Sequence, residues 1–200
     1  MVTDSVTNRN KLFPVFLKLE ELELLLVGGG NVALEKLNSL LSNSPGAKVT
    51  IVAPYIKEEV MQLLKNHPSC IMIQRSFEKT DLENKDLAIL ATDDKKLHKE
   101  IKALTDEKGI LINVADTPEL CDFYLSSIVE KGNLKIAIST NGKSPTIAKR
   151  IKEVLNETIP DEIDNLLSNM QSIRNKMSVD FAEKVKRLNE LTKTLIEKAD

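Results

Sequence analysis

The feature that most constrains the fold is a change of hydrophobic period across three consecutive glycines. Residues 22–27 are apolar except for Glu23, which is typical of a buried strand, and they end at Gly28, Gly29 and Gly30. Beyond this turn the apolar residues recur at helical spacing, at Ala33, Leu37, Leu40 and Leu41. A buried strand that passes through a glycine turn into a helix is the usual start of a β-α-β unit, so we expect parallel strands.

The same alternation continues to about residue 114. Further strands are expected at residues 49–53, 70–73, 87–91 and 111–114. Helical spacing relates Ile56, Val60, Leu63 and Leu64, and again Leu97, Ile101 and Leu104 in a helix that should end near Gly109. Right-handed crossovers favour the strand order 3-2-1-4-5. The fold class is therefore α/β, with a Rossmann-type parallel sheet over residues 1–115.

The next part of the chain has a different pattern. Residues 134–139 resemble one more strand, followed by a turn at residues 140–143. Ser144 and Pro145 are a typical N-cap and first helical residue, so a helix is expected to about Thr158. Its apolar residues, which should face inward, are Ile147, Ile151, Val154 and Leu155. We expect residues 116–145 to form a small segment and residues 146–200 a helical domain.

After Pro160 the pattern is helical throughout. One apolar stripe contains Ile163, Leu166, Leu167, Met170 and Ile173, and a second contains Phe181, Val185, Leu188 and Leu195. Two such stripes in succession predict a helical hairpin that buries an ordinary core, and residues 165–177 are not interpreted as a cofactor site.

Composition excludes several classes of function. A chain that is 42% hydrophobic and 29% charged is a folded globular protein, and its net charge of -2 supplies no general attraction for nucleic acid or anionic membranes. Two cysteines are too few for a disulfide framework. With no apolar run of membrane-spanning length and no apolar signal segment, we expect a cytoplasmic protein.

The glycine turn also matches the dinucleotide fingerprint G-x-G-x-x-A. Gly28 permits the tight turn, Gly30 leaves room for a pyrophosphate, and Ala33 allows the helix to pack closely. Asn31 and Val32 begin the helix, whose amide groups bind the anion. The usual ribose-binding acid after the second strand is missing, so the contact is expected from Pro54 and Tyr55. NAD and NADP are therefore not separated by this rule.

Polar residues follow the fourth and fifth strands, at the edge of the sheet where such folds bind ligands. Thr92 is expected to contact the cofactor, whereas Asp93 is interpreted as a helix N-cap. Asn113 and Asp116 close the fifth strand. Asp116 follows an apolar strand and is interpreted either as a partly desolvated group able to exchange protons, or as a cap or turn residue.

Beyond these general signals, the sequence resembles the precorrin-2 dehydrogenases, which include the N-terminal module of siroheme synthase. The resemblance covers about residues 13–160 in family order. Its segments are FPVF at 13–16, GGGNVA at 28–33, VTIVAP at 49–54, ATDD at 91–94, NVAD at 113–116, FYL at 123–125 and ISTNGKSP at 138–145.

This resemblance implies oxidation of precorrin-2 to sirohydrochlorin with NAD as hydride acceptor, by a homodimer in which residues 116–145 form the dimerisation segment. It implies that Asp116 is the general acid/base. It also implies that Asn31, Val32, Pro54 and Tyr55 line NAD. The glycine fingerprint and the strand ends add Gly28, Gly30, Thr92 and Asn113 to the predicted cofactor site. Substrate contacts are expected from Thr140, Asn141, Lys143 and Ser144. Thr140-Asn141-Gly142 departs from the Ser-Gly-Gly form common in the family, but Asn141 tolerates a left-handed backbone.

Two alternatives remain open at this point. The same scaffold in some relatives also inserts ferrous iron, and a dinucleotide-sensing dimer without catalysis would share the Rossmann domain. Histidine does not decide whether the chain also inserts iron, because His67 and His98 are interpreted as surface residues and not as metal ligands.

Overall fold

A computed structural model describes residues 10–193 and divides them into two compact units. The first unit contains residues 10–126 and the short turn 141–143, and the second contains residues 127–140 and 144–193. The three-part division predicted from the sequence has its first boundary after residue 115. The structure extends the first unit beyond it because Asp122 accepts a hydrogen bond from the Ile112 amide of the fifth strand.

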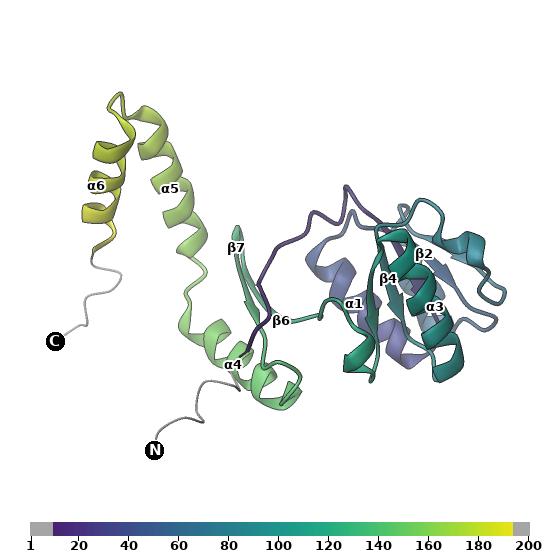
Figure 1. Cartoon of the computed structure of the whole chain (residues 1–200). Helices are drawn as coiled ribbons and strands as arrows, with labels where there is room; N and C mark the ends of the chain where they lie inside the picture. The colour runs from purple at the N-terminus through teal and green to yellow at the C-terminus, as the bar shows by residue number, and fades with distance from the viewer. Residues whose placement is uncertain (1–9, 194–200) are drawn as a thin grey trace, which may run out of the picture. The chain divides into compact units, whose positions relative to one another are not determined.

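The first unit is a parallel sheet with helices on both faces (Figure 1). Its strands are β1 (Glu23–Val27), β2 (Lys48–Val52), β3 (Ile71–Ile73), β4 (Leu87–Leu90) and β5 (Leu111–Val114), in the order β3-β2-β1-β4-β5. The helices are α1 (Asn31–Asn43), α2 (Glu58–Leu64) and α3 (Lys95–Lys108), with short 3-10 turns η1 (Lys79–Leu82) and η2 (Pro118–Leu120). The predicted α/β class and strand order are confirmed.

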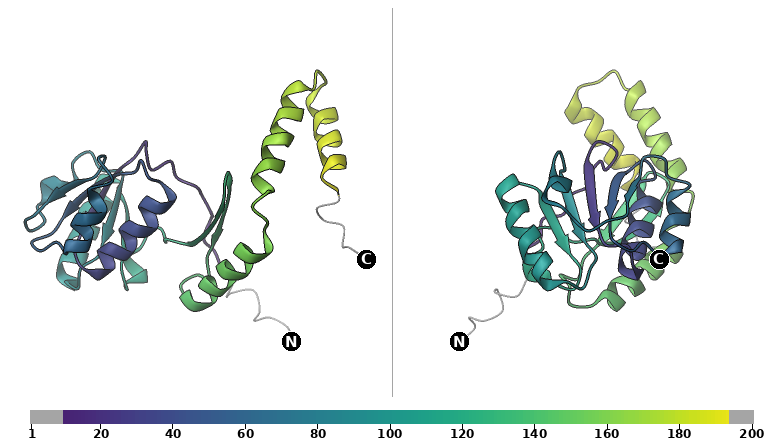
Figure 2. Two further views of the ribbon diagram at one scale, coloured as in Figure 1. Left: turned by 180° about the vertical axis from the view of Figure 1, so that it is seen from behind. Right: turned by 90° about the vertical axis from the view of Figure 1, so that its right-hand side faces the viewer.

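Alternate residues of the central strand enter two separate cores. Leu24 and Leu26 of β1 pack with α1 and α2, and the buried face of α1 consists of the four residues its spacing predicts, Ala33, Leu37, Leu40 and Leu41. Leu25 and Val27 pack on the opposite face with Ile101 of α3. Figure 2 shows both sides of this layered arrangement. Because both faces are covered, the strands are mostly apolar on both faces.

A charged pair supports the first unit beside η1. The Arg75 guanidinium donates to Asp81 over Nη1–Oδ2 and Nη2–Oδ1 distances of 2.8 and 2.6 Å, and the Asp81 side chain is 5% exposed. The Glu78 amide donates to the same carboxylate over 2.8 Å. The hydrogen bonds from Arg75 lower the pKa of Asp81, against the opposing effect of burial.

Replacing Asp81 with alanine should lower the free energy of unfolding by about 1–3 kcal/mol at pH 7, because two donors lose their acceptor. A carboxylate with a lowered pKa in the folded state stabilises fully above its unfolded pKa, about 3.9, and ceases to do so as the pH falls through the folded value. Urea unfolding at pH 7 and pH 3.5 should therefore show a smaller difference between wild type and variant at the lower pH. Glu153→Gln is the control, because Glu153 pairs with an exposed arginine on helix α4 (Pro145–Thr158) and should change stability by less than about 0.5 kcal/mol. A constant difference at both pH values would contradict the assignment.

The second unit begins with an antiparallel hairpin of β6 (Ser127–Lys131) and β7 (Leu134–Ile138). Gly132 adopts a left-handed backbone with φ of 58° at the turn, and Asp164 accepts hydrogen bonds from the Asn133 amide and side chain over 2.7 and 2.8 Å. The sequence analysis predicted β7 but missed β6. The Gly132-Asn133 pair between two apolar runs is the signal that predicts such a hairpin.

Three helices follow: α4 (Pro145–Thr158), α5 (Ile163–Lys176) and α6 (Phe181–Leu191). Helix α4 packs on the β6–β7 hairpin and buries Ala148, while α5 and α6 form the predicted helical hairpin. Ser144 caps α4, with its hydroxyl accepting from the Ile147 amide over 3.2 Å, as the sequence predicts.

The predicted burial of these helices is wrong for the single chain. Ile147, Ile151 and Val154 are 54%, 40% and 58% exposed instead of facing inward. No described residue of α5 or α6 is buried, and Leu195 of the second predicted stripe lies outside the described residues. The apolar periodicity is real, but within residues 10–193 no element buries these faces completely.

Candidate functional site

The glycine turn joins β1 to α1, and each of its three glycines has a different surrounding. Gly28 has φ of 122°, and a Cβ atom there would lie 2.2 Å from the Ala91 carbonyl oxygen. A Cβ atom on Gly29 would lie 2.3 Å from the Tyr55 carbonyl oxygen. At Gly30 a Cβ atom would meet nothing within 4 Å. Two glycines are thus required by the protein itself, and the third faces open space.

That open space lies at the N-terminus of α1. Gly30 is the N-cap residue and has no side chain to accept hydrogen bonds from the first helical amides, which have no partners within the helix. Amide donors at the positive end of a 13-residue helix are a suitable site for a diphosphate. The residues present therefore fit a bound dinucleotide, with Gly30, Asn31 and Val32 placed as predicted.

The loop after β2 closes against this turn. The Lys57 amide donates to the Gly29 carbonyl over 2.9 Å, and the Lys57 ammonium donates to Asn31 Oδ1 over 2.9 Å. Pro54 and Tyr55 are exposed beside them, with Tyr55 68% exposed. Sequence reasoning missed Gly29 and Lys57, because their importance depends on the approach of two loops distant in the chain.

The strand register brings the other predicted residues to the same edge of the sheet. Val27 pairs with Val52 and with Leu90, and Leu90 pairs with Val114. The positions two residues after these aligned strand ends are Gly29 after β1, Pro54 after β2, Thr92 after β4 and Asp116 after β5. The parallel sheet thus places the predicted cofactor and acid/base residues along its carboxyl edge, where ligands bind in such folds.

Thr92 is held by a buried histidine. Its hydroxyl lies 2.9 Å from Nε2 of His98, which is 3% exposed. The sequence interpretation of His98 as a surface residue is wrong, because His98, Ile101 and Thr105 share the buried face of α3. Their spacing of three and four residues is the signal that identifies this face. Nδ1 of His98 is buried without a partner among the described residues, which costs about 1–3 kcal/mol.

The N-cap of α3 is Asp94, not Asp93 as the sequence analysis proposed. Asp94 accepts hydrogen bonds from the Lys96 and Leu97 amides over 2.9 and 3.1 Å. These bonds, that from Leu97 first, lower the pKa of Asp94. The cap fixes the start of the helix that carries His98.

Asp116 occupies a turn immediately after β5. Its φ of 56° lies in the left-handed region, which aspartate and asparagine tolerate better than most residues. The side chain is exposed in the single chain, so the predicted partial desolvation is absent within the described residues, while the alternative interpretation as a turn residue agrees with the structure.

The segment after Asp116 folds around Cys121. Its sulfur accepts from the Val114 amide over 3.2 Å and donates to the Val114 carbonyl over 3.3 Å. Burial raises the pKa of the Cys121 thiol, which keeps it protonated as a donor. Asn113 is also buried, at 7% exposed, and its side-chain amide donates to the Phe123 carbonyl over 2.8 Å. Both residues therefore position the Asp116 turn.

The predicted substrate turn lies between β7 and α4. Asn141 has φ of 55°, which confirms its expected left-handed backbone, and Lys143 is exposed. The Thr140 hydroxyl accepts from the Ser144 amide over 3.2 Å, and the Ser144 hydroxyl caps α4. The side chains of Thr140 and Ser144 thus stabilise the turn, and their substrate contacts remain predictions.

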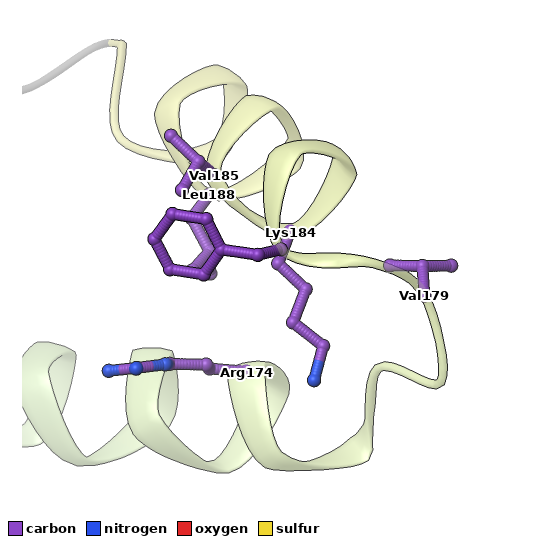
Figure 3. Close-up of a pocket in the computed structure, with 6 residues that line it drawn as sticks. Arg174, Val179, Lys184, Val185 and Leu188 are labelled. Atoms are coloured by element: carbon purple, nitrogen blue, oxygen red, sulfur yellow. The ribbon is translucent and has the colours of Figure 1, made fainter.

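A cavity of about 420 Å³ lies elsewhere, within the α5–α6 hairpin. Figure 3 shows Lys184 reaching from α6 towards α5, with Arg174 lying along α5. Val185 and Leu188 add apolar lining from α6. This cavity borders the uncovered apolar faces of the hairpin and involves none of the predicted site residues.

Among residues 10–193, no group of three or more histidine, cysteine or acidic side chains is arranged to hold a metal ion. In the same range, every helix is too short or too polar to cross a bilayer.

Comparison with known proteins places the chain in a family. A profile described as "Putative NAD(P)-binding" matches residues 15–127, more than half of the sequence. The chain belongs to this NAD(P)-binding family. A second profile, described as "Sirohaem biosynthesis protein central", matches residues 131–157. The NAD(P)-binding match confirms a nicotinamide dinucleotide site on the Rossmann-type unit, and the two profiles together confirm the family resemblance inferred from the sequence.

Individual relatives agree with this assignment. The NAD(P)-binding chain is 42% identical to siroheme synthase of Psychrobacter arcticus over 74% of its length, and 33% identical to that of Nitrosomonas europaea over 87%. It spans only 26% and 36% of those two proteins. The structure of SirC, precorrin-2 dehydrogenase, is similar with a TM-score of 0.67 at 25% identity, covering 94% of this chain and 90% of SirC.

Proposed function

We propose that the chain oxidises precorrin-2 to sirohydrochlorin with NAD as the hydride acceptor. The observation that carries this proposal is the similarity to SirC, precorrin-2 dehydrogenase, over nearly the full length of both chains. The siroheme synthases match over a part of their own length. Both comparisons support the same activity.

The residues of the site divide into distinct tasks. A bound nicotinamide dinucleotide supplies the hydride acceptor for the reaction. Gly30, Asn31 and Val32 hold its diphosphate at the start of α1. Dehydrogenation also releases a proton, and the Asp116 carboxylate, at the same edge of the sheet, accepts it. Thr140, Asn141, Lys143 and Ser144 bind the carboxylate groups of the macrocycle, in part through backbone amides of the turn.

The direct test supplies purified protein with precorrin-2 under anaerobic conditions, with NAD in one sample and NADP in another. Formation of sirohydrochlorin absorbance with NAD, and slower formation with NADP, is the expected result. Binding of NAD without any turnover would favour the dinucleotide sensor instead. Faster turnover with NADP would overturn the choice of cofactor but not the reaction.

We also propose that the protein is cytoplasmic, which is consistent with its two free thiols. We further propose that it is a homodimer. The dimer is supported by the exposed apolar side chains of α4, because a single chain leaves Ile147, Ile151 and Val154 in water. Replacing Ile151 with glutamate should shift the protein to a monomer by light scattering, since a charge there would be buried without a partner. Lys152→Glu, a charge change at the neighbouring position of the same helix, is the control. A wild-type monomer at micromolar concentration would contradict the dimer.

A further inference from the structure

His98 is a buried polar residue that the proposed mechanism does not use. It lies in the second turn of α3, and its amide donates to the Asp94 carbonyl over 3.0 Å. Its ring is enclosed by the protein, with Nε2 directed at the Thr92 hydroxyl and Nδ1 without a partner in the described part of the chain. An apolar side chain would leave no polar atom unpaired at this position. Among residues 10–193 the hydrogen bond to Thr92 is the one that the imidazole ring makes, so the role of the ring should be sought there.

Thr92 links this histidine to the dinucleotide site. It follows β4 directly beside the glycine turn, where the Ala91 carbonyl excludes any side chain at Gly28. Thr92 is half-buried, so its hydroxyl is close to both the His98 ring and the carboxyl edge of the sheet. A hydroxyl has one proton and two acceptor lone pairs, and it rotates to suit its neighbours. The partner that it meets in the protein therefore decides where its proton points.

We propose that His98 is a positioning residue for the dinucleotide, an inference that rests on the proposed function. A neutral imidazole has one N–H, and in the Nε2–H tautomer that group donates to the Thr92 oxygen. The Thr92 hydroxyl then acts as an acceptor towards His98, which leaves its own proton available for an oxygen atom of the bound dinucleotide. In the Nδ1–H tautomer the Thr92 hydroxyl donates its proton to Nε2 of His98, and the buried Nδ1–H has no acceptor among the described residues. The Nε2–H form thus leaves Nδ1 as a bare acceptor and orients the hydroxyl before the ligand arrives.

The test measures binding and stability together, using the full chain. His98→Leu should weaken NAD binding by calorimetry about 3- to 15-fold, the range expected for losing one oriented hydrogen bond. Its melting temperature should be equal to or above that of wild type, because the unpaired ring nitrogen is removed. Thr92→Val should weaken binding to the same extent, and the double variant should bind no worse than either single variant. His98→Gln can place an amide N–H near the position of Nε2, and it should restore most of the affinity.

A second measurement does not depend on the variants. Nitrogen-15 NMR of the wild-type imidazole should report the Nε2–H tautomer, with a change in the His98 signals when NAD is added. An Nδ1–H tautomer would overturn the inference, even if His98→Leu fails to fold. Equal affinity of wild type and His98→Leu for NAD would also overturn it while leaving the proposed function intact. Failure of the wild type to bind either NAD or NADP would overturn both.

Discussion

Valine in place of Gly30 is expected to abolish dinucleotide binding while leaving the fold in place. A Cβ atom at this position meets nothing within 4 Å, and the backbone angles of -92° and -157° suit a β-branched residue. The new side chain would therefore occupy the proposed diphosphate site. We expect the dissociation constant for NAD to rise at least about 100-fold, equivalent to more than about 2.7 kcal/mol of binding energy.

The same substitution at Gly28 provides the matched control. There a Cβ atom would lie 2.2 Å from the Ala91 carbonyl oxygen, and φ is 122°. Gly28→Val should therefore lose both binding and the cooperative unfolding transition. Gly30→Val should melt within a few degrees of wild type, because poorer helix capping costs about 1 kcal/mol at most. Calorimetry and thermal unfolding separate the two outcomes. Unchanged NAD affinity in folded Gly30→Val would falsify the placement of the diphosphate.

Asparagine in place of Asp116 is expected to lower the rate of precorrin-2 oxidation about 100- to 10,000-fold, the range typical for removing a general base. Asparagine tolerates the left-handed backbone at φ of 56°, so the turn should keep its conformation. The proposed NAD site lies at the glycine turn, which follows a different strand, so the dissociation constant for NAD should change less than about twofold. A low rate with normal cofactor affinity is thus the expected combination.

The control for this variant is Glu119→Gln, which removes a neighbouring exposed carboxylate in η2. It should retain the wild-type rate, because Glu119 has no assigned task in the reaction. Single-turnover measurements with saturating NAD would show whether the slow step in Asp116→Asn is the chemical one. If Asp116→Asn turned over at the wild-type rate, another group would have to accept the proton.

Periodicity and turn chemistry were sufficient to predict the first unit. Alternating β and α periods depend on local side-chain order, and a parallel sheet follows from them because neighbouring parallel strands need crossover connections. The four apolar residues of α1 and the left-handed Asn141 were predictable for the same local reason. The glycine turn was recognisable from its G-x-G-x-x-A spacing between a strand period and a helix period.

What covers each apolar face was decided only by tertiary structure. Ile147 and His98 both lie on regular helices, yet the hydrophobic residue is exposed and the polar one is buried. Spacing identifies residues that share a face, but it does not say whether another element packs against that face. Gly29 illustrates the same limit, since its requirement for glycine comes from the Tyr55 carbonyl of a separate loop. The sequence by itself therefore determined the order of elements and the dinucleotide turn. The packing between distant segments determined which side chains support that turn, because the burial of a side chain depends on the element that packs against it as well as on its own helix or strand.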